Sequence, residues 1–182
     1  MIGSGATNDY LSQTGLDALK GADILSTAPG MYTSSVEYGG SQFSQWLKNV
    51  AQVHTAGLGS RILYTGLNPG AFDTHANQPV ALSKLWGDVS AGVGDFYQDL
   101  KEHNAEREVV ILMFTEFGRR VQENGSGTDH GSGSVAFVIG DAVEGGLYGE
   151  YPSLEPDKLD EGDLRWNNDF RSTYATLLEQ WM

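Results

Sequence analysis

The sequence contains no cysteine, which excludes disulfide bonds and thiolate metal ligands. Positive charge is also scarce, since 11 Lys and Arg residues stand against 24 Asp and Glu, for a formal net charge of -13 at pH 7. The longest basic cluster is the pair Arg119-Arg120. Because nucleic-acid binding needs a basic footprint, we expect no nucleic-acid partner. A small anionic substrate would need local positive charge, from a metal ion or from these arginines.

Long apolar runs are missing as well. No stretch approaches the roughly 20 apolar residues that cross a bilayer, so no transmembrane segment is expected. Residues 1–7 lack a basic segment followed by an apolar one, so we expect no signal peptide there. The sequence leaves the oligomeric state open.

The composition is that of a folded protein. Of the 182 residues, 40% are hydrophobic and 19% charged, which is enough apolar material for a core. Residues 1–40 are weakly patterned and rich in Gly, Ser and Thr, and we expect an irregular lead-in there, with at most a short helix around Asp17–Lys20. The folded domain is expected over residues 41–182.

Apolar residues at helical spacing predict three helices. The first follows Ser41, a residue suited to cap it, and stops at Gly57 and Gly59. The second is predicted from about Pro79 to Glu102, and the last from about Asp169 to Gln180. The expected buried side of the last helix comprises Phe170, Tyr174, Leu177, Leu178 and Trp181.

Apolar runs between these helices predict strands at 61–67, 108–114 and 135–139. Residues 108–114 form a continuous apolar run, the pattern of a strand covered on both faces. The alternation of helices and strands predicts an α/β fold with a mainly parallel central sheet flanked by helices. In such sheets ligands bind at the carboxyl ends of the strands.

Polar clusters follow the predicted strands. Asp73 and His75 come after the first strand and, being two residues apart, can point to the same side of an extended backbone. Glu116 follows the apolar strand, and Asp129 and His130 lie in the glycine-rich loop 124–134. We predict that these five residues form a metal site.

The donor set indicates which metal such a site would take. Two imidazoles with carboxylates favour Zn or Mn, with Fe as an alternative, and Ca where carboxylates dominate. Arg119 or Arg120 would then hold a phosphate or sulfate oxygen of the substrate. The sequence identifies no catalytic nucleophile.

Structural roles remain open for several of these residues. Asp129 is either a ligand or a residue that caps a turn or orients His130. Glu116 is either a ligand or an ion-pair partner of Arg119 or Arg120. His54, close to the apolar side of a helix, and His103, near a helix C-terminus, are interpreted as structural.

Five strings occur together in this order: GAFDTHANQ (70–78), TEFGRR (115–120), NGSGTDHGSGSVAFVIG (124–140), GGLYGEYPSL (145–154) and DFRSTYATLLEQW (169–181). As an ordered set they resemble a bacterial family known as domain of unknown function 1501, related to the alkaline phosphatase and sulfatase superfamily. The resemblance covers roughly residues 41–182.

The resemblance implies an alkaline-phosphatase-like fold, in full or partial form, with a site for one or two metals and hydrolysis of phosphate or sulfate esters. It also implies that Asp73, His75, Glu116 and His130 are ligands, and that the acidic role is filled either by Glu116 alone or by Asp129 as well. The superfamily's nucleophile lies in an N-terminal part that this chain does not match, so the chain resembles a C-terminal portion. Members often carry an export signal, which suggests a periplasmic location.

Two functions follow as hypotheses. The first is a metal-binding, hydrolase-like domain from a phosphate- or sulfate-ester hydrolase lineage, with the nucleophile-bearing part absent. The alternative is a non-catalytic binding or assembly module that retains a vestigial metal site.

Overall fold

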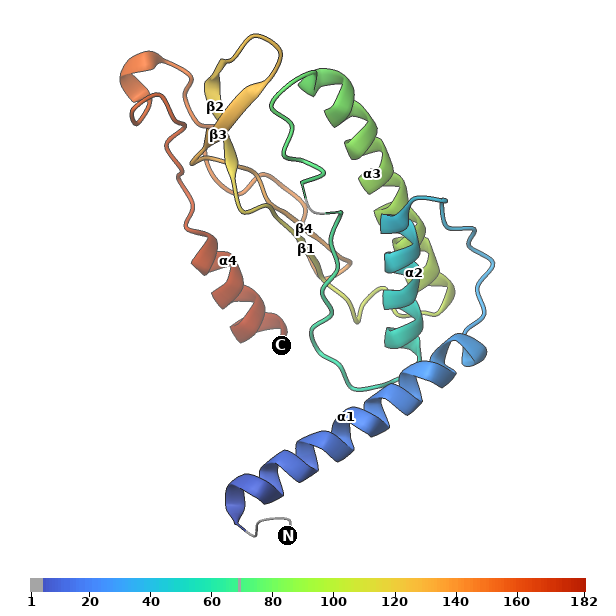
Figure 1. The fold of residues 1–182 in the computed structure, drawn as a ribbon. Coiled ribbons are helices and arrows are strands. Elements are labelled where there is room, and N and C mark those ends of the chain that lie inside the picture. Colours follow the sequence, from blue (N-terminus) through green and yellow to red (C-terminus); the bar gives the residue numbers. More distant parts are fainter. Residues whose placement is uncertain (1–4, 69) are drawn as a thin grey trace. The chain divides into compact units, whose positions relative to one another are not determined.

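The computed structural model describes residues 5–68 and 70–182 (Figure 1). Its longer elements are the helices α1 (Ala6–Met31), α2 (Gln42–Thr55) and α3 (Gln78–Glu102). The remaining elements are shorter and lie toward the C-terminus: β1 (Ile111–Met113), β2 (Gly118–Glu123), β3 (Thr128–Gly131), β4 (Phe137–Ile139), the 3-10 turn η1 (Pro156–Lys158), α4 (Phe170–Thr176) and the π-helical turn η2 (Leu177–Trp181).

Local signals predict α2 and α3 correctly. The hydroxyl of Ser41 accepts a hydrogen bond of 3.2 Å from the backbone N–H of Ser44, which caps the start of α2. Gly57 follows the helix with a φ of 65°, and its N–H donates to the carbonyl oxygen of His54. This left-handed conformation is readily adopted by glycine, so the helix ends where the sequence predicts.

Helix α1 occupies the segment that was expected to be irregular. It spans 26 residues, and the only buried side chain described in it is that of Ala28. Its hydrogen bonds are largely local; for example, the Thr14 hydroxyl donates to the carbonyl oxygen of Tyr10. The sequence does not indicate this helix, because Gly, Ser and Thr have low helix propensity and no apolar stripe marks a packed face.

The predicted fold class is wrong. In the described residues, strands pair only as two small antiparallel sheets: β1 with β4, where Ile111 lies opposite Ile139, and β2 with β3, where Arg119 lies opposite His130. There is thus no parallel central sheet and no alkaline-phosphatase-like architecture in this part of the chain, and residues 61–67 form no strand. The reason lies in the connection between β1 and β4, which contains a hairpin and no helix. Parallel neighbours need a long crossover, usually helical, whereas this connection returns the chain antiparallel.

The C-terminal helix forms, but its predicted buried side is not buried. Asp169 caps α4 by accepting a hydrogen bond of 2.9 Å from the N–H of Arg171. Phe170 is 70% exposed and Leu178 is 58% exposed. Helical spacing identifies an apolar face, but burial depends on whether another element covers that face.

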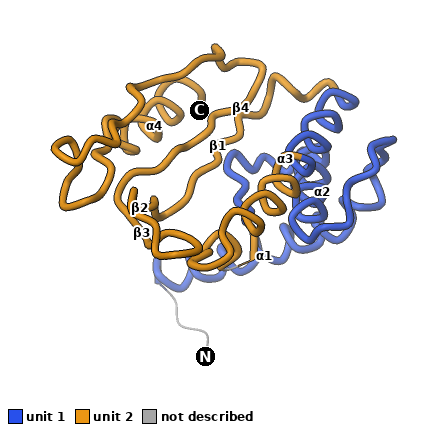
Figure 2. The backbone as a smooth tube through the Cα atoms, turned by 90° about the horizontal axis from the view of Figure 1, so that it is seen from above, with its two compact units in different colours: residues 1–66, 91–103 blue, residues 67–90, 104–182 orange. Residues whose placement is uncertain are grey.

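Two compact units make up the chain (Figure 2). One comprises residues 1–66 and 91–103, the other residues 67–90 and 104–182, so that α3 contributes to both. None of the described helices combines the length and apolar character needed to cross a membrane.

The first unit contains a buried carboxylate, that of Asp99 on α3. Its Oδ2 accepts hydrogen bonds from the hydroxyls of Tyr38, at 2.7 Å, and Tyr32. The ring of His103 stacks on Tyr32, and its Nε2 lies 3.0 Å from the carbonyl oxygen of Thr33. These contacts attach the segment after α1 to the last turns of α3, which is a structural role for His103.

Candidate metal centre

The second unit carries the candidate site, and its first part is the segment that leads into α3. The N–H of Asp73 donates to the carbonyl oxygen of Gly70 in a turn, after which residues 73–75 belong to no helix or strand. On an extended backbone, side chains two residues apart share one side. Accordingly, Nε2 of His75 lies 2.9 Å from Oδ1 of Asp73, in the arrangement predicted for this pair.

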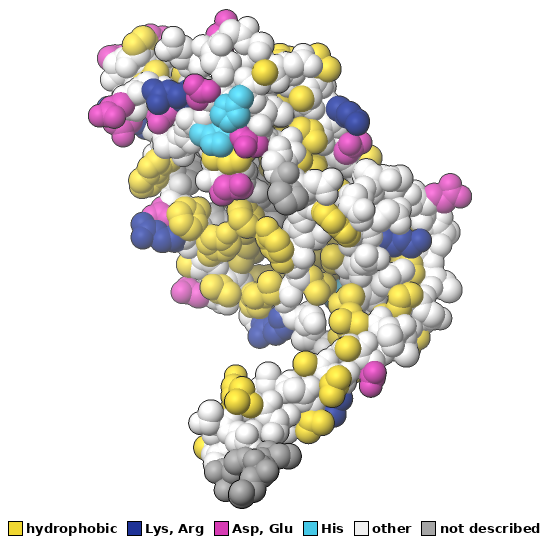
Figure 3. All heavy atoms as spheres, in the orientation of Figure 1, with side chains coloured by type: hydrophobic (Ala, Val, Ile, Leu, Met, Phe, Trp, Pro, Cys, Tyr) yellow, Lys and Arg dark blue, Asp and Glu magenta, His cyan; other side chains and the backbone are white. Residues whose placement is uncertain are grey.

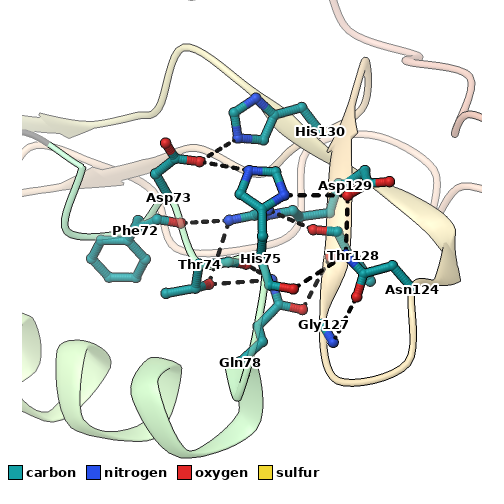
Figure 4. Close-up of polar contacts among 11 residues, drawn as sticks. Phe72, Asp73, Thr74, His75, Gln78, Asn124, Gly127, Thr128, Asp129 and His130 are labelled. Carbon is teal, nitrogen blue, oxygen red and sulfur yellow. Dashed lines mark hydrogen bonds and ion pairs between the residues drawn. The ribbon is translucent and has the colours of Figure 1, made fainter.

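The second part of the site is the β2–β3 hairpin, whose tip is organised by Asn124. The side-chain oxygen of Asn124 accepts a hydrogen bond of 3.1 Å from the backbone N–H of Gly127. The backbone N–H of Asn124 donates one of 2.9 Å to the carbonyl oxygen of Gly127. Strand β3 then carries Asp129 and His130 to the segment that leads into α3 (Figure 4).

Three side chains converge where these parts meet. Nε2 of His130 lies 2.7 Å from Oδ1 of Asp73, the same oxygen that contacts His75. The candidate ligand atoms of Asp73, His75 and His130 all lie within 4.8 Å of one another, and the three side chains are exposed. Figure 3 shows histidine and acidic side chains side by side on the surface. Two imidazoles and one carboxylate with a solvent-facing side match the donor set of a catalytic zinc site with one open position.

Hydrogen bonding keeps the carboxylates in the form a cation requires. The pKa of Asp73 lies below its usual value, first because of its hydrogen bond with His130 and then because of that with His75. The pKa of Asp129 is lowered mainly by a hydrogen bond from Asn124, and next by one from His75. Both carboxylates are therefore ionised at neutral pH, which suits metal binding.

Arg119 joins the two parts of the site. Its Nη2 donates to the carbonyl oxygen of Phe72 at 2.6 Å, and its Nη1 donates to that of Thr128 at 2.7 Å. The guanidinium also lies over the ring of Phe117, which stacks on His130 with ring centroids 4.0 Å apart. These contacts restrain the ring of His130 and the residue before Asp73.

The structure brings together only part of the predicted ligand set. Asp129 contacts His75 but does not join the group of ligand atoms, and neither does Glu116, an exposed residue. Arg120 donates to the carbonyl oxygen of Glu161 and lies 3.7 Å from Asp163. Substrate binding by Arg119 or Arg120 stays a prediction.

Comparison with protein families gives one match. Residues 48–179 match the model of a family described as protein of unknown function DUF1501. The chain belongs to this family. Comparisons with curated proteins and with solved structures found no match.

Two polar residues of this DUF1501 chain that help to build the site, Gln78 and Asn124, were not among the residues predicted from the sequence. Buried Gln78 connects the two parts, because its Nε2 donates to the carbonyl oxygen of Thr74 at 2.9 Å and its Oε1 accepts from the hydroxyl of Thr128 at 3.0 Å. Asn124 is the other. Both lie within two of the strings on which the resemblance rests, GAFDTHANQ and NGSGTDHGSG, and these strings were the sequence signal for them.

Proposed function

We propose that this DUF1501 chain binds one divalent transition metal ion through Asp73, His75 and His130, and that the site serves the hydrolysis of small anionic esters of phosphate or sulfate. The observation that carries the proposal is the convergence of these three ligand atoms from segments more than 50 residues apart. Zn and Mn are the favoured ions because the donors are two imidazole nitrogens and a carboxylate, whereas Ca prefers oxygen ligands throughout.

The residues fit such an ion in charge as well as in donor type. Both carboxylates near the histidines have lowered pKa values, and the net charge of -13 favours cation binding in general. When bound, a divalent ion would supply Lewis acidity toward an ester oxygen and acidify a coordinated water. The protein's own part is to hold the three ligands in place through Arg119, Gln78 and Phe117.

The hydroxyl groups nearest the ligands favour a supporting role over nucleophilic attack. The Thr128 hydroxyl donates to Gln78, and the Thr74 hydroxyl lies 3.3 Å from the Gln78 side-chain nitrogen. These hydroxyls bond to Gln78 and Arg119, and neither residue is a base that would activate a nucleophile. This observation supports the alternative function, a non-catalytic binding module that keeps the metal site.

The experiment that tests the proposal is metal analysis of the chelator-treated and reloaded protein by elemental mass spectrometry. We expect close to one Zn or Mn per chain, with loss in His130→Ala and Asp73→Ala. Glu116→Gln is the matched control, since it removes a carboxylate charge outside the group of ligand atoms. No bound metal in the reloaded wild-type protein would refute the proposal.

A screen with p-nitrophenyl phosphate and p-nitrophenyl sulfate separates the two functions. Turnover by the metal-loaded protein that disappears in His130→Ala supports the hydrolase. Stoichiometric metal without turnover of either ester supports the binding module.

A further inference from the structure

The ring of His75 contacts a carboxylate through each of its two nitrogens. Nε2 lies 2.9 Å from Oδ1 of Asp73, and Nδ1 lies 3.2 Å from Oδ1 of Asp129 (Figure 4). A neutral imidazole carries one N–H, and an ionised carboxylate can only accept, so the two contacts compete for one proton. Where that proton resides determines which nitrogen has a free lone pair.

The carboxylate of Asp129 is itself held in place by the hairpin. Nδ2 of Asn124 donates to Oδ1 of Asp129 at 3.0 Å and to the backbone carbonyl oxygen of His75 at 3.1 Å. Asn124 is fixed in turn by its two bonds with Gly127. The hairpin thus presents a preoriented acceptor to Nδ1 of His75, on the side of the ring away from Asp73.

We infer that Asp129 is a positioning residue, which accepts the Nδ1 proton of His75 when a metal ion takes Nε2. The inference rests on the proposed metal site and differs from the prediction that Asp129 is itself a ligand. A carboxylate hydrogen-bonded to the far nitrogen of a ligating histidine fixes its tautomer and orientation and raises its basicity. The site then has three protein ligands and takes one ion.

Calorimetric titration of the metal-free protein with Co²⁺ tests this inference. Wild type should bind one ion, and Asp129→Ala should still bind one ion with a Kd raised about 10–100-fold, the range for residues that support a ligand. Asp157→Ala, which removes an exposed carboxylate in the same unit, is the control and should bind like wild type. Asp73→Ala should lose binding altogether.

Three outcomes would overturn the inference, and they are distinguishable. Equal Kd values for wild type and Asp129→Ala would refute the positioning role alone. A wild-type stoichiometry of two that falls to one in Asp129→Ala would show that Asp129 is a ligand. The absence of Co²⁺ binding to wild type would refute the proposed function together with the inference.

A second readout follows the proton on the ring of His75. Nitrogen-15 NMR of the Zn²⁺-loaded protein reports which ring nitrogen bears the proton and which binds the metal. Wild type should show the proton on Nδ1, and this proton should exchange faster with solvent in Asp129→Ala, because its acceptor is removed. Asp157→Ala should leave the exchange unchanged. A proton on Nε2 in the loaded wild-type protein would contradict the inference.

Discussion

The guanidinium of Arg119 donates one hydrogen bond to the carbonyl oxygen of Phe72 and another to that of Thr128. Phe72 precedes Asp73, and Thr128 lies two residues before His130, the two residues being proposed metal ligands. A single side chain thereby sets the spacing between the two segments that carry the ligands. The planar fork of an arginine can make both bonds at once, whereas the ammonium of a lysine is a compact point donor.

Arg119→Ala should therefore weaken both the fold and the metal site. We expect a loss of about 1–3 kcal/mol in the free energy of unfolding, because two backbone carbonyl groups lose a charged donor. Thermal denaturation and Zn²⁺ titration would measure the two effects. Arg119→Lys should recover little of the Zn²⁺ affinity, and Arg120→Ala, which affects contacts with Glu161 and Asp163, should retain it. Wild-type Zn²⁺ affinity in Arg119→Ala would contradict this role.

Gly127 is a position where the absence of a side chain brings the hairpin close to the ligand segment. A Cβ atom at this residue would lie 2.5 Å from the carbonyl oxygen of His75. Gly127→Ala must therefore displace backbone, and we expect a loss of about 1–3 kcal/mol in stability, as for other overpacked sites, with weaker metal binding. Gly145→Ala is the control, since its Cβ would meet nothing within 4 Å. Equal melting temperatures for the two variants would show that the hairpin tip accommodates the methyl group.

The buried carboxylate of Asp99 makes alkaline stability depend on Tyr32. Burial, and next the hydrogen bond to Asp99, raises the pKa of Tyr32 from 10.0 to about 12. A raised pKa in the folded state means that the contribution to stability is complete below pH 10 and is lost as the pH rises to about 12. The absorbance of tyrosinate should show a late titration step that is missing in Tyr32→Phe. The unfolding free energy of wild type should fall more steeply than that of Tyr32→Phe between pH 10 and 12, and parallel profiles would contradict this prediction.

The stability of the N-terminal cap of α4 should decrease in acid. The side chain of Arg171, and next its backbone N–H, lowers the pKa of Asp169 from 3.8 to about 2. The lowered pKa means that this cap contributes fully above about pH 4 and loses its contribution as the pH falls toward 2. A carbon-13 NMR titration of the Asp169 carboxyl would measure the midpoint. Arg171→Ala should raise that midpoint toward 3.8, and an unchanged midpoint would show that Arg171 is not the cause.

Features that depend on neighbours in the sequence could be predicted. The apolar spacing and the Ser41 cap define α2, and an apolar stripe defines α3, because the side chains and caps of a helix interact within a few residues. The pairing of Asp73 with His75 is also local, since it needs only two residues on an extended backbone.

The architecture could not be predicted in the same way. The run 108–114 has the composition of a strand in a parallel sheet, but only Ile111–Met113 is a strand, and its partner β4 runs antiparallel. Apolar composition favours strand formation without specifying the partner or its direction. The exposed Phe170 shows the same limit for a helix, because burial requires a second surface.

The proposed metal site depends both on local sequence features and on the tertiary arrangement. The sequence by itself determined the pairing of Asp73 with His75 and the family to which residues 48–179 belong, and it predicted the donor types of the proposed metal site. Only the tertiary structure decided that His130 joins this pair while Glu116 does not, and that Asp129 faces His75 instead of His130. The sequence predicted that these side chains meet at the ends of parallel strands. In the structure they meet where Arg119 and Gln78 hold the β2–β3 hairpin against the segment before α3. Contacts between residues some 50 positions apart depend on the path of the whole chain, and spacing in the sequence does not encode that path.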